Sequence, residues 1–510
     1  MAKQKYRFVE DFINPETGTS YENLNSPRMV ATKRFGTREL HVIAKVVLTK
    51  KEVMRSTVEI DAAGRTIKGP AKATVVYVEK MGEQGGYVEK YENLAQGGEC
   101  WVSGGAVVCG DAYVSGDAEI SSSAEVGDNA HVMGEAKVSD SAIVSGNALV
   151  FGKAEVSGSG TEVSGYARVE GKVTSQSTVG DQAVVGADGE VSDKSSASDY
   201  AQVYGKLTKE SSASGNSIVY GTANKSSEID GNAVLLPSGE VVESIVSGNS
   251  IVAGKVNNSR VGAGGGQPYI ADGATISQKS FAEDNAYVEG TMGQKSGAEG
   301  NAVVGKNGYL YNEGLVFANA RVNGRVGQES SAGANARVDG VLSQNSAAKD
   351  NAVVAKRGGA AQSDVLGNSF VDSSVKRLSS TGGIVLGKVD DSIITGGILI
   401  SEDGGLESGR MDGSAVAAGK VKGGSVIGNA VVSSGGSVDN GLLTYNSRTS
   451  AAYRGRAAGN GMAIASSSKD VSGNGILAAD GMGASGNQVF VSKEDTRPGE
   501  AAVICKVEKE

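Results

Sequence analysis

The sequence contains few of the residues on which enzymatic and metal chemistry most often depends. Of its 510 residues, 2 are histidine, 3 are cysteine and 6 are proline, and aromatic residues make up 5%. Cys100, Cys109 and Cys505 are too few and too far apart for a disulfide framework or a four-cysteine zinc site. We therefore expect small, partly buried thiols, and neither a metal nor a cofactor.

Long apolar runs and an excess of one charge are missing as well. No run of about 18 apolar residues is present, which excludes a transmembrane helix. The start, MAKQKYRFVEDFINPETG, lacks the apolar segment of a secretory signal peptide. The net charge is −9, with the two signs interspersed, so the sequence predicts no nucleic-acid partner and no membrane insertion. Collagen is excluded because proline is scarce and glycine does not fall at every third position.

What the sequence has in excess is glycine, 75 residues, much of it in an internal repeat. From Val102 the pattern A-x-V-x-G-D/N recurs every six residues. The small residues of this pattern are Ala106, Ala112, Ala118, Ala124, Ala130, Ala136, Ala142, Ala148 and Ala154. The aliphatic residues that follow them are Val108, Val114, Ile120, Val126, Val132, Val138, Val144, Val150 and Val156.

The spacing of this repeat predicts a β-solenoid. Alternation within each A-x-V places both side chains on one face of a short strand, and glycine with Asp or Asn forms the next corner. Three such sides make a triangular coil of about 18 residues, and coils stack about 4.8 Å apart, as paired strands do. This is the hexapeptide pattern of the left-handed parallel β-helix; the alternation and the repeated corner glycines exclude an α-helical period.

Later coils are shorter. Beyond Val156, after one step of seven residues that absorbs Gly158–Gly160, steps of six alternate with occasional steps of four. The step of four is clearest among the predicted core residues Val322, Val326, Ala332, Val338, Leu342, Ala348 and Val354. One corner of these coils is therefore shortened by two residues. The predicted fold class is an all-β, single-stranded parallel β-helix with coils of 16–18 residues.

Changes in pattern divide the chain into four parts. Residues 1–98 carry dense charge and alternating runs, which predict a small β-rich head for attachment, and residues 99–357 are the regular solenoid. Residues 358–487 predict less regular, Gly/Ser-rich coils, with 445–487 read either as irregular coils or as loop. In residues 488–510, two alternating runs flank the turn signal Arg497–Gly499, which predicts a hairpin that caps the last coil.

The junction of head and solenoid, GGYVEKYENLAQGGECWV, resembles a bacterial and phage family of left-handed β-helix proteins, the YdcK-like group. The residues that fit this family's lead-in are Gly85, Gly86, Val88, Glu89, Asn93, Leu94, Cys100, Trp101 and Val102. Tyr87 and Ala95 depart from it, and Lys5–Arg7 are similar to its start. The resemblance covers residues 85–240 and implies either an acyltransferase-like protein or, for phage members, a tail or fibre part.

Hexapeptide acyltransferases use a histidine as general base, and the repeats contain only His131. His131 stands between Ala130 and Val132, at the position that points to solvent, among charged residues of neighbouring repeats. We expect a surface residue there and treat His131 only as a weak catalytic candidate. The other histidine, His41, lies in an alternating run and is expected to pack or to lie at the surface.

Other candidate sites have simpler structural readings. Gly262–Gln267 lacks the Lys-Ser/Thr and the helix of a phosphate loop, and the corners lack the calcium-binding nonapeptide repeat. The adjacent acids Asp390–Asp391 and Glu402–Asp403 are expected to be exposed, although a spike glycosidase assembles its carboxylates in space rather than in sequence. The outward aromatic residues, either a sugar-binding ladder or scattered strand tyrosines, are Tyr113, Tyr166, Tyr204, Tyr220 and Tyr287.

An apolar group among the outward positions, Ile143, Leu149 and Phe151, predicts a contact patch for the head or for another subunit, or merely scattered surface apolar residues. We expect a homo-oligomer, with three-fold symmetry by analogy with other hexapeptide solenoids.

The function expected is that of a non-enzymatic structural or adhesive protein. It would be a phage tail fibre, spike or other virion component that binds tail proteins through its head, with a surface glycan as a further candidate partner. The alternatives are a cytoplasmic acyltransferase-like protein and a polysaccharide-degrading spike.

Overall fold

The structure is a computed structural model that describes most of the chain. It describes the backbone of residues 5–9, 32–35, 37–60, 66–262 and 264–372, and beyond them the strands β53 to β72; side chains are described for 5–9, 37–47, 81–262 and 264–372. The chain divides into two compact units, residues 1–232 and 233–510. Each unit is described by itself.

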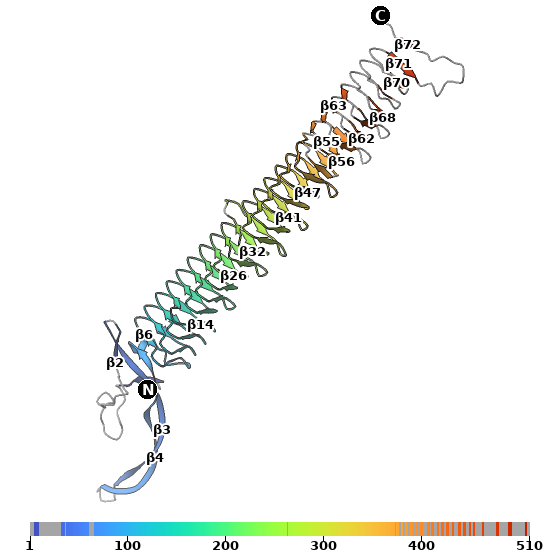
Figure 1. Ribbon diagram of the computed structural model, residues 1–510. Coiled ribbons are helices and arrows are strands. Elements are labelled where there is room, and N and C mark those ends of the chain that lie inside the picture. The colour runs from blue at the N-terminus through green and yellow to red at the C-terminus, as the bar shows by residue number, and fades with distance from the viewer. Residues whose placement is uncertain are drawn as a thin grey trace. The chain divides into compact units, whose positions relative to one another are not determined.

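In the first unit, short parallel strands stack in three sheets. β6 (Val107–Val108) belongs to sheet 1, β7 (Tyr113–Val114) to sheet 2 and β8 (Glu119–Ile120) to sheet 3, after which β9 (Glu125–Val126) lies on β6 in sheet 1. The chain thus winds through the three sheets once per coil (Figure 1). Sheets are named in the same way in the second unit, where β28 (Val234–Leu235), β29 (Glu240–Val242) and β30 (Ile245–Val246) begin sheets 2, 3 and 1.

The alanine and valine positions of the repeat fill the interior. Every small and aliphatic residue predicted between Ala106 and Val156 is buried, and so are the predicted core residues Val322 to Val354. The prediction of an all-β solenoid of parallel coils is confirmed. The described part of the chain contains no α-helix, and η3 (Tyr91–Asn93) is a short 3-10 turn before the first regular coil.

Glycine is required at the corners between sheets 2 and 3 of the first unit. Gly116, Gly134 and Gly152 have φ of 70°, 74° and 67°, a region in which other residues are strained. A Cβ on Gly116 would lie 2.8 Å from the backbone nitrogen of Gly134 in the next coil. These glycines are therefore needed both for their conformation and for the close approach of neighbouring coils.

The corner that is shortened in 16-residue coils is the one between sheets 2 and 3. In the second unit, β45 (Ser331–Ala332), β46 (Arg337–Val338) and β47 (Val341–Ser343) form one such coil, and β48 (Ala347–Ala348) lies on β45. Only Asp339 and Gly340 separate β46 from β47. A Cβ on Gly340 would lie 1.9 Å from the carbonyl oxygen of Gly358, so this tight corner needs glycine.

Asparagines at the corners between sheets 1 and 2 form a ladder in the second unit. Each Nδ2 donates to the Oδ1 of the asparagine one coil on, at 2.9–3.2 Å. The ladder consists of Asn285, Asn301, Asn319, Asn335, Asn351 and Asn368. Such a ladder forms because parallel stacking places identical side chains above one another.

A buried serine column fills the small-residue position at the corner between sheets 3 and 1. In the first unit, the backbone N–H of Ser195 donates to Ser177 Oγ at 3.2 Å, and that of Ser211 donates to Ser195 Oγ at 3.2 Å. The Ser211 hydroxyl donates to the Thr208 carbonyl at 2.8 Å. Serine suits this position better than alanine because its hydroxyl adds hydrogen bonds to buried backbone groups of the corner.

The outward row of sheet 3 in the first unit alternates in charge. It reads Glu119, Lys137, Glu155, Lys172, Glu190, Lys206 from coil to coil. The ammonium of Lys172 lies 3.0 Å from Glu155, and that of Lys206 lies 3.0 Å from Glu190. These pairs are exposed and weak individually, but the alternation keeps like charges from facing one another across neighbouring strands.

The head is built on a long hairpin. β3 (Arg38–Ile60) and β4 (Thr66–Val88), each 23 residues long, pair antiparallel, and β1 (Tyr6–Phe8) and β2 (Thr32–Phe35) pair antiparallel with β3. The end of β4, Tyr87 and Val88, pairs in parallel with β6. The hairpin strand therefore runs directly into the coils.

Beyond residue 372 the strands continue to pair in parallel. Among residues 445–487, β67 (Arg448–Thr449), β69 (Met462–Ala463) and β70 (Ile476–Ala478) stack in sheet 2. β71 (Gln488–Val491) lies on β70 and pairs antiparallel with β72 (Cys505–Lys506), as the predicted hairpin requires. The predicted turn Arg497–Gly499 lies outside the described residues.

The assignment of Val338 to the buried interior can be tested by replacing it with a charged residue. Val338 is fully buried and Val341, on the next strand, is 37% exposed. We expect Val338→Asp to lower the free energy of unfolding by at least about 3 kcal/mol, because the carboxylate has no partner in the core. Val341→Asp is the matched control and should cost little. Chemical denaturation followed by circular dichroism measures both, and equal losses in the two variants would contradict the assigned facing of these strands.

Candidate functional site

The lead-in that carries the family resemblance is itself a coil. Tyr87 and Val88 lie on β6, Leu94 bridges to Val114 of β7, and β5 (Trp101–Val102) lies on β8. The backbone N–H groups of Tyr87, Ala95 and Trp101 donate to carbonyls of the following coil at 2.8–2.9 Å. Residues 87–102 therefore cover all three sides of the first regular coil.

Two side chains of this lead-in pair with the backbone of the coil beneath it. Asn93 is fully buried; its Nδ2 donates to the carbonyls of Gly110 and Ala112 at 3.0 and 2.8 Å, and its Oδ1 accepts from Lys90 N–H at 2.8 Å. A Glu89 carboxylate oxygen accepts from Gly110 N–H at 2.5 Å and from the Arg38 guanidinium at 2.8 Å. Burial alone would raise the pKa of Glu89, but these two hydrogen bonds outweigh it and lower the pKa below its usual value.

Residues of the head close the other side of the lead-in. The Tyr6 hydroxyl, fully buried, lies 2.5 Å from the Leu94 carbonyl and 2.7 Å from that of Tyr91. Burial raises the pKa of Tyr6 and keeps it a hydrogen-bond donor. The ammonium of Lys5 donates to the Cys100 carbonyl at 2.6 Å. The motif thus forms an end cap, which a solenoid needs because its first coil would otherwise expose unpaired strand edges.

Each histidine lies where its local sequence pattern predicts. His131 is exposed on β10 (His131–Val132), with Tyr113 and Leu149 as its neighbours in sheet 2. The Tyr113 ring is 6.0 Å away, edge-on. Neither neighbour offers a carboxylate or carbonyl to orient the imidazole as a general base. His41 is half-buried and stacks on Phe8 at 4.6 Å.

The three residues of the predicted contact patch do not share one side of the coil. Ile143, 38% exposed, is on β12 (Ile143–Val144) in sheet 1, whereas Leu149 is half-buried on β13 (Leu149–Val150) in sheet 2. Phe151 follows β13, and the Arg168 guanidinium lies over its ring at 5.8 Å. A contact that used all three residues would have to wrap around the corner between sheets 1 and 2.

The outward tyrosines do not form one row. Tyr204 and Tyr220 stack on each other in the first unit at 5.1 Å and 13°, while Tyr287 stacks on Tyr269 in the second unit at 5.4 Å and 6°. Tyr113 lies in sheet 2 and Tyr166, 66% exposed, lies at a corner. The outward tyrosines therefore form separate stacked pairs in the two units rather than one continuous ladder for a sugar.

The remaining sequence candidates have structural roles or lie outside the described side chains. Cys100 and Cys109 are free and buried, and burial raises the pKa of both thiols. Gly262 and residues 264–267 lie in a long corner between β33 (Arg260–Val261) and β34 (Tyr269–Ile270). Side chains of Cys505, of Asp390–Asp391 and of Glu402–Asp403 are outside the described set. Among the side chains described, no cluster of three or more His, Cys, Asp or Glu residues suits a metal ion.

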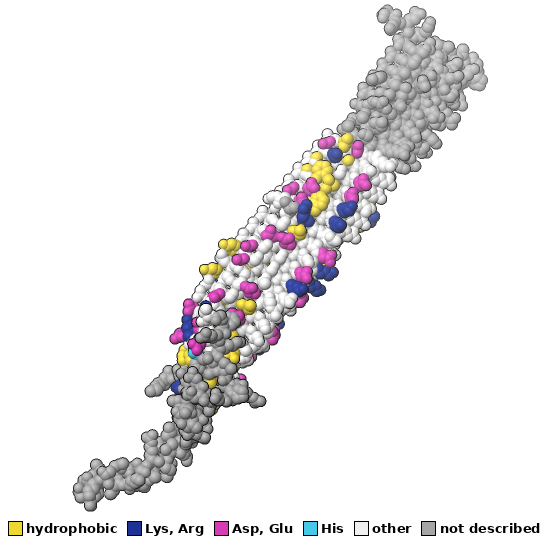
Figure 2. All heavy atoms as spheres, turned by 60° about the vertical axis from the view of Figure 1, so that its left-hand side comes forward, with side chains coloured by type: hydrophobic (Ala, Val, Ile, Leu, Met, Phe, Trp, Pro, Cys, Tyr) yellow, Lys and Arg dark blue, Asp and Glu magenta, His cyan; other side chains and the backbone are white. Residues whose placement is uncertain are grey.

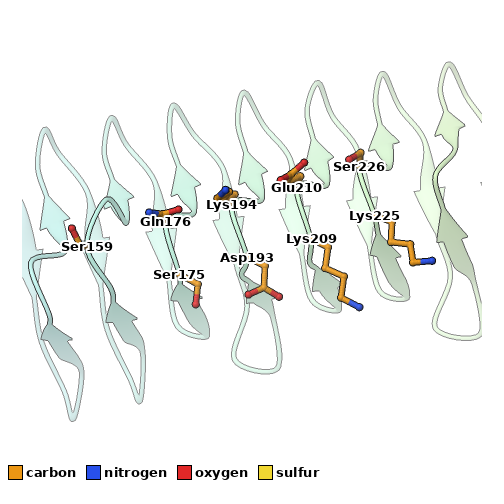
Figure 3. A pocket seen from close by; sticks show the side chains of 9 residues that line it. All are labelled: Ser159, Ser175, Gln176, Asp193, Lys194, Lys209, Glu210, Lys225 and Ser226. Atoms are coloured by element: carbon orange, nitrogen blue, oxygen red, sulfur yellow. The ribbon is translucent and has the colours of Figure 1, made fainter.

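A groove runs along the corner between sheets 3 and 1 of the first unit, with a volume of about 720 Å³. Each of four successive corners there contains two consecutive residues of positive φ. These pairs are Ser175–Gln176, Asp193–Lys194, Lys209–Glu210 and Lys225–Ser226. Figure 3 shows the first residues of these pairs in one row and the second residues in another, with Ser159 at one end. This site was not predicted from the sequence.

Backbone N–H groups along the floor of this groove already donate hydrogen bonds to carbonyls of the preceding coil. The N–H of Lys194 donates to the Ser175 carbonyl at 2.9 Å, and Glu210 N–H donates to the Asp193 carbonyl at 2.8 Å. The same corner of the second unit forms a groove of about 730 Å³. It is lined by Asn258, Gln278, Lys279, Gln294, Lys295, Asn312, Glu313, Gln328 and Glu329.

Charge on the surface is mixed. On the face displayed in Figure 2, basic and acidic side chains are interspersed over the coils rather than gathered by sign. No helix in the described part of the chain is long and apolar enough to cross a membrane.

Comparison with known proteins gives no assignment. No protein-family model matches the chain, and no curated protein matches it.

The end cap makes a prediction about stability. Asn93→Ala removes two hydrogen bonds and leaves the Gly110 and Ala112 carbonyls buried without them, so we expect a loss of about 2 kcal/mol in the free energy of unfolding. Asn129→Ala is the control, because Asn129 is an exposed corner asparagine whose side-chain amide donates to the exposed Asn147 rather than to buried backbone. Thermal unfolding of the two variants measures the difference. Equal midpoints would show that the lead-in does not stabilise the coils.

Proposed function

We propose that the chain is a non-enzymatic structural and adhesive protein, a tail fibre, spike or other component of a virion appendage. In this proposal the coils belong to the left-handed hexapeptide class, residues 1–98 attach to a neighbouring virion protein, and the shaft self-associates with three-fold symmetry. The localisation would be the virion if a phage encodes the chain, and the cytoplasm otherwise.

The observation that carries the proposal is that the described side chains mainly hold one coil to the next. Inside both units they form columns of valine and alanine, and outside they form ladders that pair one coil with the next. The lead-in and residues 5–9 are used to close the first coil. Cohesion along the coils is the property that these contacts serve, and a structural shaft requires it.

The head hairpin supports attachment. In the described part of the chain, β3 beyond Val46 and β4 before Gln84 pair only with each other. A two-stranded ribbon is marginally stable alone, and its open edges are templates for further strands. A partner strand or a second subunit would complete it.

The acyltransferase alternative depends on His131 and is tested together with the proposal. We expect antibodies against the first coils to decorate tail appendages on particles from producing cells, seen by electron microscopy. Purified protein should release no coenzyme A from acetyl-coenzyme A in the presence of amino sugars. His131→Ala should leave the unfolding midpoint and the labelling unchanged, because an exposed side chain contributes little.

Two outcomes would reject the structural role. One is antibody label confined to the cytoplasm of producing cells. The other is acyl transfer by the parent protein that His131→Ala abolishes; the isosteric variant His131→Asn would then separate loss of the base from loss of packing.

A further inference from the structure

The corner between sheets 3 and 1 of the second unit holds side chains where glycine would be less strained. Five successive corners there carry two residues of positive φ in a row, and none of the ten is glycine. The pairs are Gln278–Lys279, Gln294–Lys295, Asn312–Glu313, Gln328–Glu329 and Gln344–Asn345. Elsewhere in the chain glycine is abundant at corners of positive φ, as at Gly116, Gly134 and Gly152.

The conformation makes these side chains costly to keep. Positive φ disfavours every residue with a Cβ, and strain of this kind is retained where the surrounding structure uses the side chain. At the corner between sheets 1 and 2 the residues of positive φ are short. Gly300, Ala318 and Ala334 precede asparagines of the ladder. Asp284 and Asp350 accept a backbone N–H of the next coil. In the described part of the second unit, the Gln, Lys and Glu residues of positive φ all lie at the corner between sheets 3 and 1, where the groove runs.

One wall of this groove is a row of carboxamides. The first residues of the pairs, Gln278, Gln294, Asn312 and Gln328, stand one coil apart along it. Each carboxamide offers two N–H donors and an oxygen acceptor on neighbouring atoms. Vicinal hydroxyls of a sugar match this pair of functions. A polymer of sugars that lies along the coils would meet one carboxamide per coil.

The opposite wall carries balanced charge. Lys279 and Lys295 face the same groove as Glu313 and Glu329, and Lys295 pairs with Glu313 at 3.0 Å. A groove with equal numbers of both charges does not provide the basic track that a phosphate backbone needs. Nucleic acid is therefore a poor fit.

A peptide strand is also a poor fit, because the backbone of the groove floor is already bonded. The N–H groups of Lys295, Glu313 and Glu329 donate to carbonyls of the preceding coil at 2.8–2.9 Å. Strand addition needs free N–H and C=O groups on an edge. The groups left to recognise a ligand are side-chain amides and charges.

We propose that the groove of the second unit binds an extended neutral polysaccharide, held along the coils by hydrogen bonds from Gln278, Gln294, Asn312 and Gln328. The inference rests on the proposed adhesive function and names its ligand class and its site. The groove of the first unit has the same corner geometry but lacks the carboxamide row, since its first residues are Ser175, Asp193, Lys209 and Lys225. It serves as the internal comparison.

The experiment uses the full chain and two matched double variants. Gln294→Gly with Gln328→Gly removes two carboxamides from the second groove, and Asp193→Gly with Lys209→Gly removes two side chains of opposite charge from the first. Glycine suits positive φ, so both variants should unfold at or above the temperature of the parent. Binding is measured on immobilised dextran, mannan, galactan and purified bacterial O-antigen polysaccharides.

We expect the parent to bind at least one of these polysaccharides. The loss of two hydrogen-bonding carboxamides should weaken that binding about tenfold or more, while the variant in the first groove should bind as the parent does. Equal loss in the two variants, no binding of any of the polysaccharides by the parent, or displacement of bound polysaccharide by DNA or an unstructured peptide would overturn the proposal. The antibody labelling of appendages is independent of these results, so failure here leaves the structural role to be judged by its own test.

Discussion

Parallel pairing of each strand with the strand one coil on is the constraint from which the rest of the molecule follows. It places every side chain directly against its counterpart in the next coil, so each position of the coil becomes a column in which identical or complementary chemistry is repeated. Valine and alanine fill the inward columns, Asn301, Asn319 and Asn335 bond one another along a corner, and Glu155 and Lys172 alternate on an outer face. Each contact is modest by itself, and repetition makes the columns cohesive.

The same parallel pairing would leave the backbone groups on the outer edge of the first coil unpaired. The lead-in pairs with them. Residues 87–102 supply one strand segment for each sheet, and Asn93 and Glu89 bond groups around Gly110. Tyr6 then covers the lead-in from the head. A motif that resembles a family signature therefore has a structural explanation here, without reference to catalysis.

The corners are of two kinds. Some have glycine where the backbone turns or approaches the next coil closely, and others have long polar residues at positive φ. Gly116, Gly134 and Gly340 permit turns and close approaches that a Cβ would prevent. The corner between sheets 3 and 1 adopts positive φ at two consecutive residues and still carries Gln, Lys, Glu or Asn. The grooves lie there because neighbouring coils line up these long side chains in two rows (Figure 3). A surface for recognition can thus be added to a stacked coil without disturbing its core.

Local spacing was sufficient to predict the class of fold, the inward columns from Ala106 to Val156, the corner shortened at Asp339–Gly340 and the exposure of His131, because all of these depend on alternation and on steps of four or six residues. Contacts between coils were decided by the tertiary structure. Asn93 contacts Gly110 and Ala112 for reasons that no single repeat contains. The asparagine ladder, the serine column and the carboxamide row likewise depend on the register between coils of unequal length. That register is set by the packing of the whole coil, whereas alternation is a property of a few consecutive residues.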